Sequence, residues 1–280
     1  MLYVCPTPIG NLGDITLRVL DALRQADLVA AEDTRRTRKL LSHYSISKPL
    51  VSFFEHNEIR RLPDLLKKLK EGKTVALVSD AGMPGICDPG YRLVKAALDD
   101  GLQVVVLPGP SAVETALVSS GFASDSFVFV GYLPRKKGEL DKVLEAIAGE
   151  SRSCVAFETP HRLAATLSAA IPHLGERRIA VCRELTKKFE EILRGTAAEL
   201  SLRLSQKVKG EIVLVFEPGE QEIPRETGPS DSVEAAIRGL LDEGISARKL
   251  SELVALATGV SKNRAYKLTL QIKQNMQRVS

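Results

Sequence analysis

An acidic residue follows an apolar stretch of the chain and opens a loop rich in glycine and proline. Residues 74–78 form an apolar, β-branched run that is typical of a buried strand in a parallel sheet. Asp80 follows this run, and residues 82–90 contain three glycines and two prolines. Glycine lets backbone approach a ligand closely, and proline limits alternative loop shapes. Because ligands of open α/β sheets bind beyond the carboxyl ends of strands, the segment predicts a site for a small polar, positively charged ligand. An ordinary strand-to-helix turn is the alternative.

Two clusters of ionisable residues follow predicted strands in the second half of the chain. Glu158, His161 and Arg162 stand after one strand, and residues 183–191 (RELTKKFEE) stand after the next. Loops at strand ends carry function more often than the elements that they connect. These clusters are therefore candidate functional groups, with surface ion pairs as the alternative.

Several nucleotide-binding and hydrolase motifs are incomplete. The first turn has Gly10 and Gly13 but lacks the G-x-G-x-x-G pattern of dinucleotide sites. Residues 109–113 resemble a nucleophile elbow, yet Val113 replaces its last glycine. We expect Ser111 to cap a helix near the ligand, because serine is favoured at that position.

The pattern of apolar runs and turns predicts an α/β fold with two α/β domains. Five predicted strands alternate with helices in the first half, at residues 2–7, 28–32, 50–54, 74–78 and 103–107. This alternation indicates a parallel sheet. Further strands are predicted at 127–133, 154–158, 179–184 and 211–217, while 190–194 fits a strand or a helix.

The predicted domains are residues 1–115 and 121–218, followed by a linker at 219–231 and a helical segment at 232–280. From Ile245 onward the chain has seven Lys or Arg residues and one acidic residue, Glu252. A helix up to Thr258, a turn at Gly259 and a second helix capped by Ser261 resemble a helix-turn-helix. The tail therefore predicts contact with a polyanion, and a solvated helix face is the alternative. The basic residues expected to make this contact are Arg248, Lys249, Lys262, Arg264 and Lys267.

Composition excludes several classes of protein. No apolar run approaches the roughly 20 residues that span a bilayer, and no signal peptide is evident, so no membrane contact is expected. The four cysteines are far apart, which argues against a zinc site or a disulfide framework and fits a reducing cytoplasm.

The motifs together resemble one family. TPIGNLGDIT, AEDTR, VSDAGMPGICDPG, LPGPSA, FETPHR, RELTK and GEIVLVFEP occur in the order of the RsmI-type ribosomal RNA methyltransferases. This is the bacterial small-subunit RNA (cytidine-2′-O-)methyltransferase I family, within the tetrapyrrole methylase superfamily. The resemblance covers essentially the entire chain and implies an N-terminal, mainly parallel sheet, a C-terminal mixed sheet and a small helical domain.

The resemblance also implies an activity and its partners. S-adenosylmethionine would lie between the two α/β domains of a homodimer, and the methyl acceptor would be a cytidine ribose 2′-hydroxyl in the decoding region of 16S ribosomal RNA. By motif position, the cofactor would be lined by Ile9, Gly10, Asp80, Ala81, Gly82, Met83, Pro84, Ser111, Ala112 and Phe157.

The hydroxyl is a poor nucleophile that benefits from a base or a neighbouring cation. Glu158, Glu184 and Lys187 are the candidates for this role, and Arg183 is a candidate for holding a phosphate or the cofactor. Two other functions stay open: a small-molecule tetrapyrrole methylase and a non-catalytic RNA-binding assembly factor.

Overall fold

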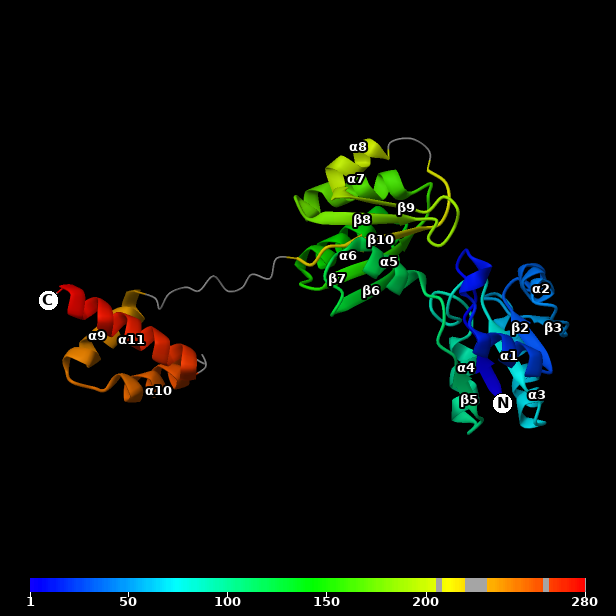
Figure 1. Ribbon diagram of the computed structural model, residues 1–280, viewed down its shortest axis with the longest axis horizontal. Coiled ribbons are helices and arrows are strands. Elements are labelled where there is room, and N and C mark those ends of the chain that lie inside the picture. Colours follow the sequence, from blue (N-terminus) through cyan, green and yellow to red (C-terminus); the bar gives the residue numbers. More distant parts are fainter. Residues whose placement is uncertain (205–207, 220–230, 259–261, 280) are drawn as a thin grey trace. The chain divides into compact units, whose positions relative to one another are not determined.

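The computed structural model describes residues 1–204, 208–219, 231–258 and 262–279 (Figure 1). The chain forms two compact units, Met1–Gly219 and Glu220–Ser280. Each unit has its own core of buried apolar side chains. The larger unit contains two sheets and the smaller unit contains helices only within its described residues.

The first sheet is parallel throughout and has the strand order β3-β2-β4-β1-β5. Its strands are β1 (Leu2–Val4), β2 (Leu28–Ala31), β3 (Leu50–Ser52), β4 (Val75–Val78) and β5 (Val104–Val106). All residues of β2 and β4 are buried, as expected for central parallel strands covered on both faces. The predicted parallel sheet is confirmed.

Four helices cover this sheet, two on each face. Apolar residues of α1 (Leu17–Gln25) and α2 (Thr34–His43) pack on one face, and those of α3 (Glu58–Lys70) and α4 (Tyr91–Asp99) on the other. The Asp33 carboxylate accepts a hydrogen bond from the Arg35 amide at 2.8 Å and so caps the N-terminus of α2. Gly90, with φ +138°, is the residue before α4.

The second sheet is mixed and has the order β6-β7-β10-β8-β9. Its strands are β6 (Phe127–Tyr132), β7 (Ser153–Glu158), β8 (Arg178–Arg183), β9 (Glu191–Thr196) and β10 (Ile212–Phe216). Only β6 and β7 pair in parallel; the other pairs are antiparallel. The ambiguous segment 190–194 therefore belongs mainly to a strand.

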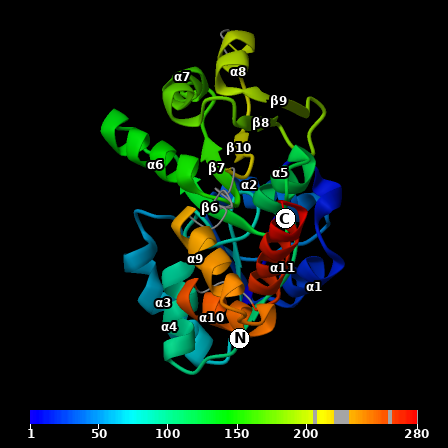
Figure 2. The same cartoon turned by 90° about the vertical axis from the view of Figure 1, so that its left-hand side faces the viewer.

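Helices α6 (Lys137–Gly149), α7 (Leu163–Leu174) and α8 (Ala197–Arg203) cover one face of this second sheet (Figure 2). The other face packs against α5 (Ala112–Ser120), which follows the last strand of the first sheet. Ile9, from the loop after β1, joins the same apolar cluster. The two sheets are thus connected by a shared core, and the predicted domain boundary at residues 115–121 falls on α5.

The smaller unit contains α9 (Asp231–Asp242), α10 (Ala247–Thr258) and α11 (Lys262–Val279) (Figure 2). Its core consists of Ile237, Leu250, Val254, Ala265 and Ile272. The predicted turn at Gly259, the cap at Ser261 and most of the linker at 219–231 lie outside the described residues. Within the described ranges, no helix is both long enough and apolar enough to cross a membrane.

Candidate functional site

A cavity of about 470 Å³ lies in the larger unit and is lined by both α/β halves. The loops after β1, β2, β4 and β5 form one side, and residues of β6, β7 and β10 form the other. Most of the predicted cofactor residues line it: Ile9, Asp80, Ala81, Gly82, Met83, Ser111, Ala112 and Phe157. Glu158 lines it too, whereas Gly10, Pro84, Arg183, Glu184 and Lys187 are not among the lining residues.

The loop that follows β4 is held by backbone hydrogen bonds to the loop that follows β1. The Thr7 amide donates to the Gly82 carbonyl and the Gly82 amide donates to the Thr7 carbonyl, each at 2.9 Å. The Thr7 hydroxyl also donates to the Ser79 carbonyl at 3.0 Å. Gly82 has φ +74°, a conformation that strains any residue with a Cβ atom. This link fixes the position of Asp80 and Ala81 at the cavity wall.

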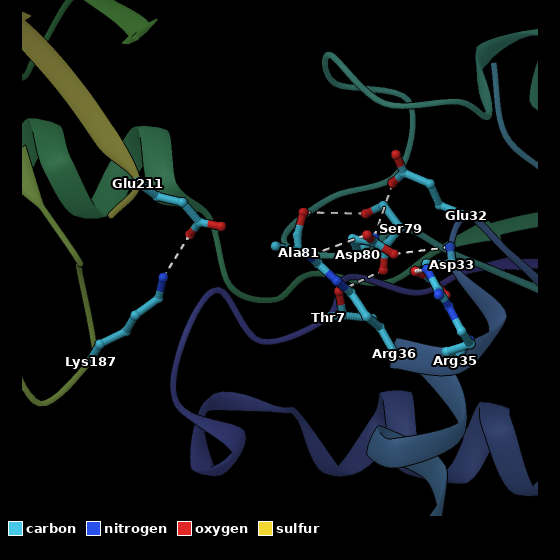
Figure 3. A network of polar contacts seen from close by, with 10 residues as sticks. All are labelled: Thr7, Glu32, Asp33, Arg35, Arg36, Ser79, Asp80, Ala81, Lys187 and Glu211. Atoms are coloured by element: carbon cyan, nitrogen blue, oxygen red, sulfur yellow. Dashed lines mark hydrogen bonds and ion pairs between the residues drawn. The ribbon is translucent and has the colours of Figure 1, made fainter. Parts of the chain in front are cut away.

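The Asp80 carboxylate has partners in the segment that follows β2, the strand beside β4 in the sheet (Figure 3). It accepts a hydrogen bond from the Asp33 amide at 3.0 Å and forms an ion pair with Arg36 at 3.2 Å. The Asp80 amide in turn donates to the Glu32 carboxylate at 3.2 Å. The negative charge of Asp80 is therefore partly balanced by Arg36, and both side chains line the cavity.

Three carboxyl groups, those of Glu32, Asp80 and Asp88, form an acidic wall of the cavity. Burial raises the pKa of Asp88 to about 7, and the nearby Glu32 and Asp80 charges add to the rise. Burial and the Asp80 charge also raise the pKa of Glu32. The acidic wall thus carries a proton near neutral pH that a cationic ligand can replace. Glu32 and Asp88 were not predicted, although both lie in the quoted segments AEDTR and VSDAGMPGICDPG.

An aromatic wall contributed by the second sheet completes the cavity. The Phe157 ring lies 5.0 Å from Phe129 and 5.3 Å from Tyr132 between centroids, with edge-to-face geometry in both pairs. A bulge in β6, with Gly131 at φ +73°, shifts the register before Tyr132. Phe157 was predicted, but the other two rings depend on strand pairing that the motifs do not specify.

Gly10 does not line the cavity, but it allows two loops beside the cavity to approach each other closely. A Cβ atom at this position would lie 2.5 Å from Lys187 Cγ and 2.9 Å from the Leu185 carbonyl oxygen. The loop after β1 therefore touches the loop after β8 only because residue 10 is glycine. In that second loop Glu184 and Thr186 have φ +53° and +65°, a strained conformation that concentrates at functional sites.

Lys187 links two carboxylates beside the cavity. Its ammonium donates to Glu184 at 2.8 Å. It also donates to Glu211 at 3.0 Å (Figure 3). Burial works to lower the pKa of Lys187, but the bonds to Glu184 and Glu211 outweigh it and the pKa is raised. The same bond to Lys187 lowers the pKa of Glu184. Glu211 lines the cavity and was not predicted, although it belongs to the quoted segment GEIVLVFEP.

Two other predicted residues have structural partners. The Glu158 carboxylate is buried and accepts hydrogen bonds from the Thr159 amide at 2.6 Å and the Thr166 hydroxyl at 2.5 Å. It also pairs with Arg162 at 3.3 Å. Arg183 pairs with Glu191 of the adjacent strand at 2.7 Å. This saturation argues against Glu158 as a proton acceptor and against Arg183 as a free anion-binding group.

The predicted tail residues all belong to the smaller unit. Arg248 and Lys249 are exposed on α10, and Lys262 and Lys267 are exposed on α11. Arg264 also belongs to α11, but its side chain lies outside the described residues.

We predict that Glu158→Gln lowers the free energy of unfolding by about 2 kcal/mol, because the amide cannot satisfy all the buried donors that face it. Chemical denaturation measures this change. The matched control is Glu211→Gln, at an exposed carboxylate, for which the change stays within about 0.5 kcal/mol. A Glu158→Gln protein that unfolds like the wild type would contradict the structural role.

The acidic wall predicts a pH-dependent stability. The raised pKa of Asp88 means that the folded protein binds more protons than the unfolded chain between about pH 4 and pH 7. The free energy of unfolding therefore falls as pH rises through this window. Asp88→Asn removes this fall. At pH 8 the free energy of unfolding of the variant is therefore higher than that of the wild type by on the order of 1 kcal/mol, after allowance for solvent screening.

Thermal unfolding between pH 4 and pH 8 tests this prediction. Asp99→Asn, at an exposed carboxylate on α4 that pairs with Lys95, is the control and gives no such gain. Parallel pH profiles of the wild type and Asp88→Asn would show that Asp88 does not carry the retained proton.

The family profile of the tetrapyrrole (corrin/porphyrin) methylases matches residues 1–201. A ribosomal RNA small subunit methyltransferase I of Vibrio cholerae is 45% identical over 282 residues, covering 97% of this chain and 94% of the relative. The protein of the same name from Halalkalibacterium halodurans is 43% identical over 270 residues, which cover 95% of this chain and 93% of the relative. That of Thermotoga maritima is 47% identical over 216 residues, which cover 77% of this chain and 97% of the relative.

Solved structures show the same fold at low sequence identity. The methyltransferase CobJ is 19% identical with a TM-score of 0.60, covering 78% of this chain and 93% of CobJ. Uroporphyrin-III C-methyl transferase from Thermus thermophilus, complexed with S-adenyl homocysteine, is 16% identical with a TM-score of 0.55, covering 78% and 97%. The fold, the profile match and the full-length relatives agree: the chain belongs to the ribosomal RNA small subunit methyltransferase I family of the tetrapyrrole methylases.

Proposed function

We propose that this chain transfers a methyl group from S-adenosylmethionine to the ribose 2′-hydroxyl of a cytidine in the decoding region of 16S ribosomal RNA. The observation that carries the proposal is the cavity with its acidic and aromatic walls. It lies in a chain related over nearly its full length to proteins named ribosomal RNA small subunit methyltransferase I. We further propose a homodimer that acts on the small ribosomal subunit in the cytoplasm, on the basis of the family resemblance alone.

The residues of the cavity fit S-adenosylmethionine. A volume of about 470 Å³ is in the usual range of small-molecule sites. The carboxylates of Glu32, Asp80 and Asp88 suit its positive charges, and the Phe129–Tyr132–Phe157 wall suits a flat apolar group. The cofactor would be held by Ile9, Asp80, Ala81, Gly82, Met83, Ser111, Ala112 and Phe157, while Gly10 and the buried Pro84 shape the loops behind them. When bound, the cofactor supplies a methyl group on a positively charged sulfur.

The chain's own groups activate and orient the acceptor hydroxyl. Lys187 stays protonated, so it acts as a cation and not as a base. It holds the Glu211 carboxylate at the cavity wall, where the side chain is 66% exposed and accessible to a hydroxyl proton. Of the groups near the cavity, Glu211 is therefore the one that we propose as proton acceptor. Glu184 keeps Lys187 in place from outside the cavity.

Mapping of methylated riboses tests the function. We expect the purified protein, incubated with small ribosomal subunits and isotopically labelled S-adenosylmethionine, to label a single cytidine ribose, which mass spectrometry of RNA fragments identifies. Label on a tetrapyrrole and not on RNA would favour the small-molecule methylase. RNA binding without any transfer would favour the assembly factor.

Asp80 is expected to be required for cofactor affinity. Asp80→Ala removes a carboxylate of the acidic wall that pairs with Arg36 and accepts a hydrogen bond from the Asp33 amide. We predict that the affinity for the cofactor falls about tenfold or more, as expected for the loss of a charged hydrogen bond. Calorimetric titration with S-adenosylmethionine measures this. Asp21→Ala, at an exposed residue on α1, is the control and binds normally. Undiminished affinity in folded Asp80→Ala protein would place the cofactor elsewhere.

The tail is predicted to dock RNA. A chain that ends at Gly219 should bind the cofactor normally, yet lose RNA affinity and show a shallower dependence of that affinity on salt, because each phosphate contact contributes a slope of roughly −0.7 to −0.9. Binding titrations at several salt concentrations measure both effects. If the truncated chain methylates its substrate as well as the full chain, the tail is not a docking module.

A further inference from the structure

Helix α2 presents a basic face next to the cavity. It begins directly after β2, so its first turns lie at the edge of the sheet where the cavity is. Its ten residues include Arg35, Arg36, Arg38 and Lys39 and contain no acidic residue. All four of these side chains are exposed, whereas Thr37, Leu40 and Leu41 face the core. The helix is therefore apolar on one side and cationic on the other.

Part of this charge has no acidic partner. Arg35 pairs with Asp33 at 2.8 Å, and Arg36 pairs with Asp80 at 3.2 Å. Among the described residues, no ion pair within 4.0 Å is found for Arg38 or Lys39. These two cations follow Arg36, a residue of the cofactor cavity, by two and three positions on α2.

A second, smaller cavity lies beside α2 and shares two lining residues with the first. It has a volume of about 210 Å³ and is lined by Arg36, Lys39, Thr37 and the loops after β1 and β4. Arg36 and Asp80 line both cavities. A chain of phosphates that followed α2 would therefore reach the edge of the cofactor cavity at Arg36.

We propose that the basic face of α2 binds the phosphates of the RNA strand that flank the target nucleotide, with Lys39 at the phosphate nearest to the reacting ribose. This inference rests on the proposed function, because it needs RNA as the methyl acceptor. The strand must be unpaired at this point, since the ribose has to enter a cavity that also holds the methyl donor.

The relatives support an RNA contact outside the tail. The Thermotoga maritima protein bears the same name, and its alignment with this chain covers 97% of its length in only 216 residues. It has no room for a tail like the last 60 residues of this chain, roughly the extent of the smaller unit. An RNA contact in addition to that of the tail is therefore expected in the larger unit, to which α2 belongs.

The test is a double neutralisation, Arg38→Gln with Lys39→Gln, in the full chain. Affinity for a single-stranded fragment of 16S RNA is measured from 0.05 to 0.3 M salt without the cofactor, so that no turnover is needed. Loss of two contacts makes the log–log salt slope shallower by about 1.4 and weakens binding roughly 25-fold at 0.1 M salt. The affinity for S-adenosylmethionine stays unchanged, and the KM for RNA rises in the methylation assay.

The matched control is Lys67→Gln with Lys68→Gln, which removes the same charge from exposed positions in the last turn of α3. That turn precedes β4 and so lies at the opposite edge of the sheet. Equal salt slopes for the wild type and the α2 variant, or equal losses in both variants, would overturn the inference. Competition by poly-glutamate as strong as that by RNA would overturn it as well. If the wild type binds RNA through α2 but transfers no methyl group, the proposed function fails while the docking surface stands.

Discussion

Two backbone hydrogen bonds between Thr7 and Gly82 fix the loops that follow β1 and β4, and the cavity is built around that link. On one side of it, Ile9 enters the core under the second sheet and Gly10 touches Leu185 and Lys187. On the other side, Asp80 is aligned with the Asp33 amide and with Arg36. Backbone bonds of this kind do not depend on side-chain identity except at Gly82, where φ is positive. The position of the acidic wall relative to the aromatic wall follows from these contacts.

The acidic wall gives the cavity an electrostatic preference for a cation. Glu32 and Asp88 have raised pKa values because burial and mutual repulsion disfavour their charged forms. A cation bound beside these carboxylates would reduce that repulsion. Arg36 balances Asp80 and, with its neighbours on α2, gives the outer edge of the same region a positive charge. One site can therefore accept a cationic donor inside and a polyanion outside.

Sequence patterns predicted the parallel sheet, the loop after β4, and the cap at Ser111, because these depend on local spacing and backbone conformation. Eight of the ten predicted cofactor residues line the cavity for the same reason. Glu32, Asp88, Tyr132 and Glu211 were missed, since their meeting depends on strand order and on the bulge at Gly131. For Glu158, sequence position does not show that Thr159, Arg162 and Thr166 already bind its carboxylate. Helices α6 and α8 were not predicted either.

A crystal structure of the chain with S-adenosylhomocysteine, the demethylated product, tests most directly whether one cavity built by both sheets holds the methyl donor. We expect electron density for the product between the Asp80–Met83 loop and the Phe129–Tyr132–Phe157 wall, in contact with residues of both sheets. Density at any other surface, or a product held by the first sheet alone, would contradict it.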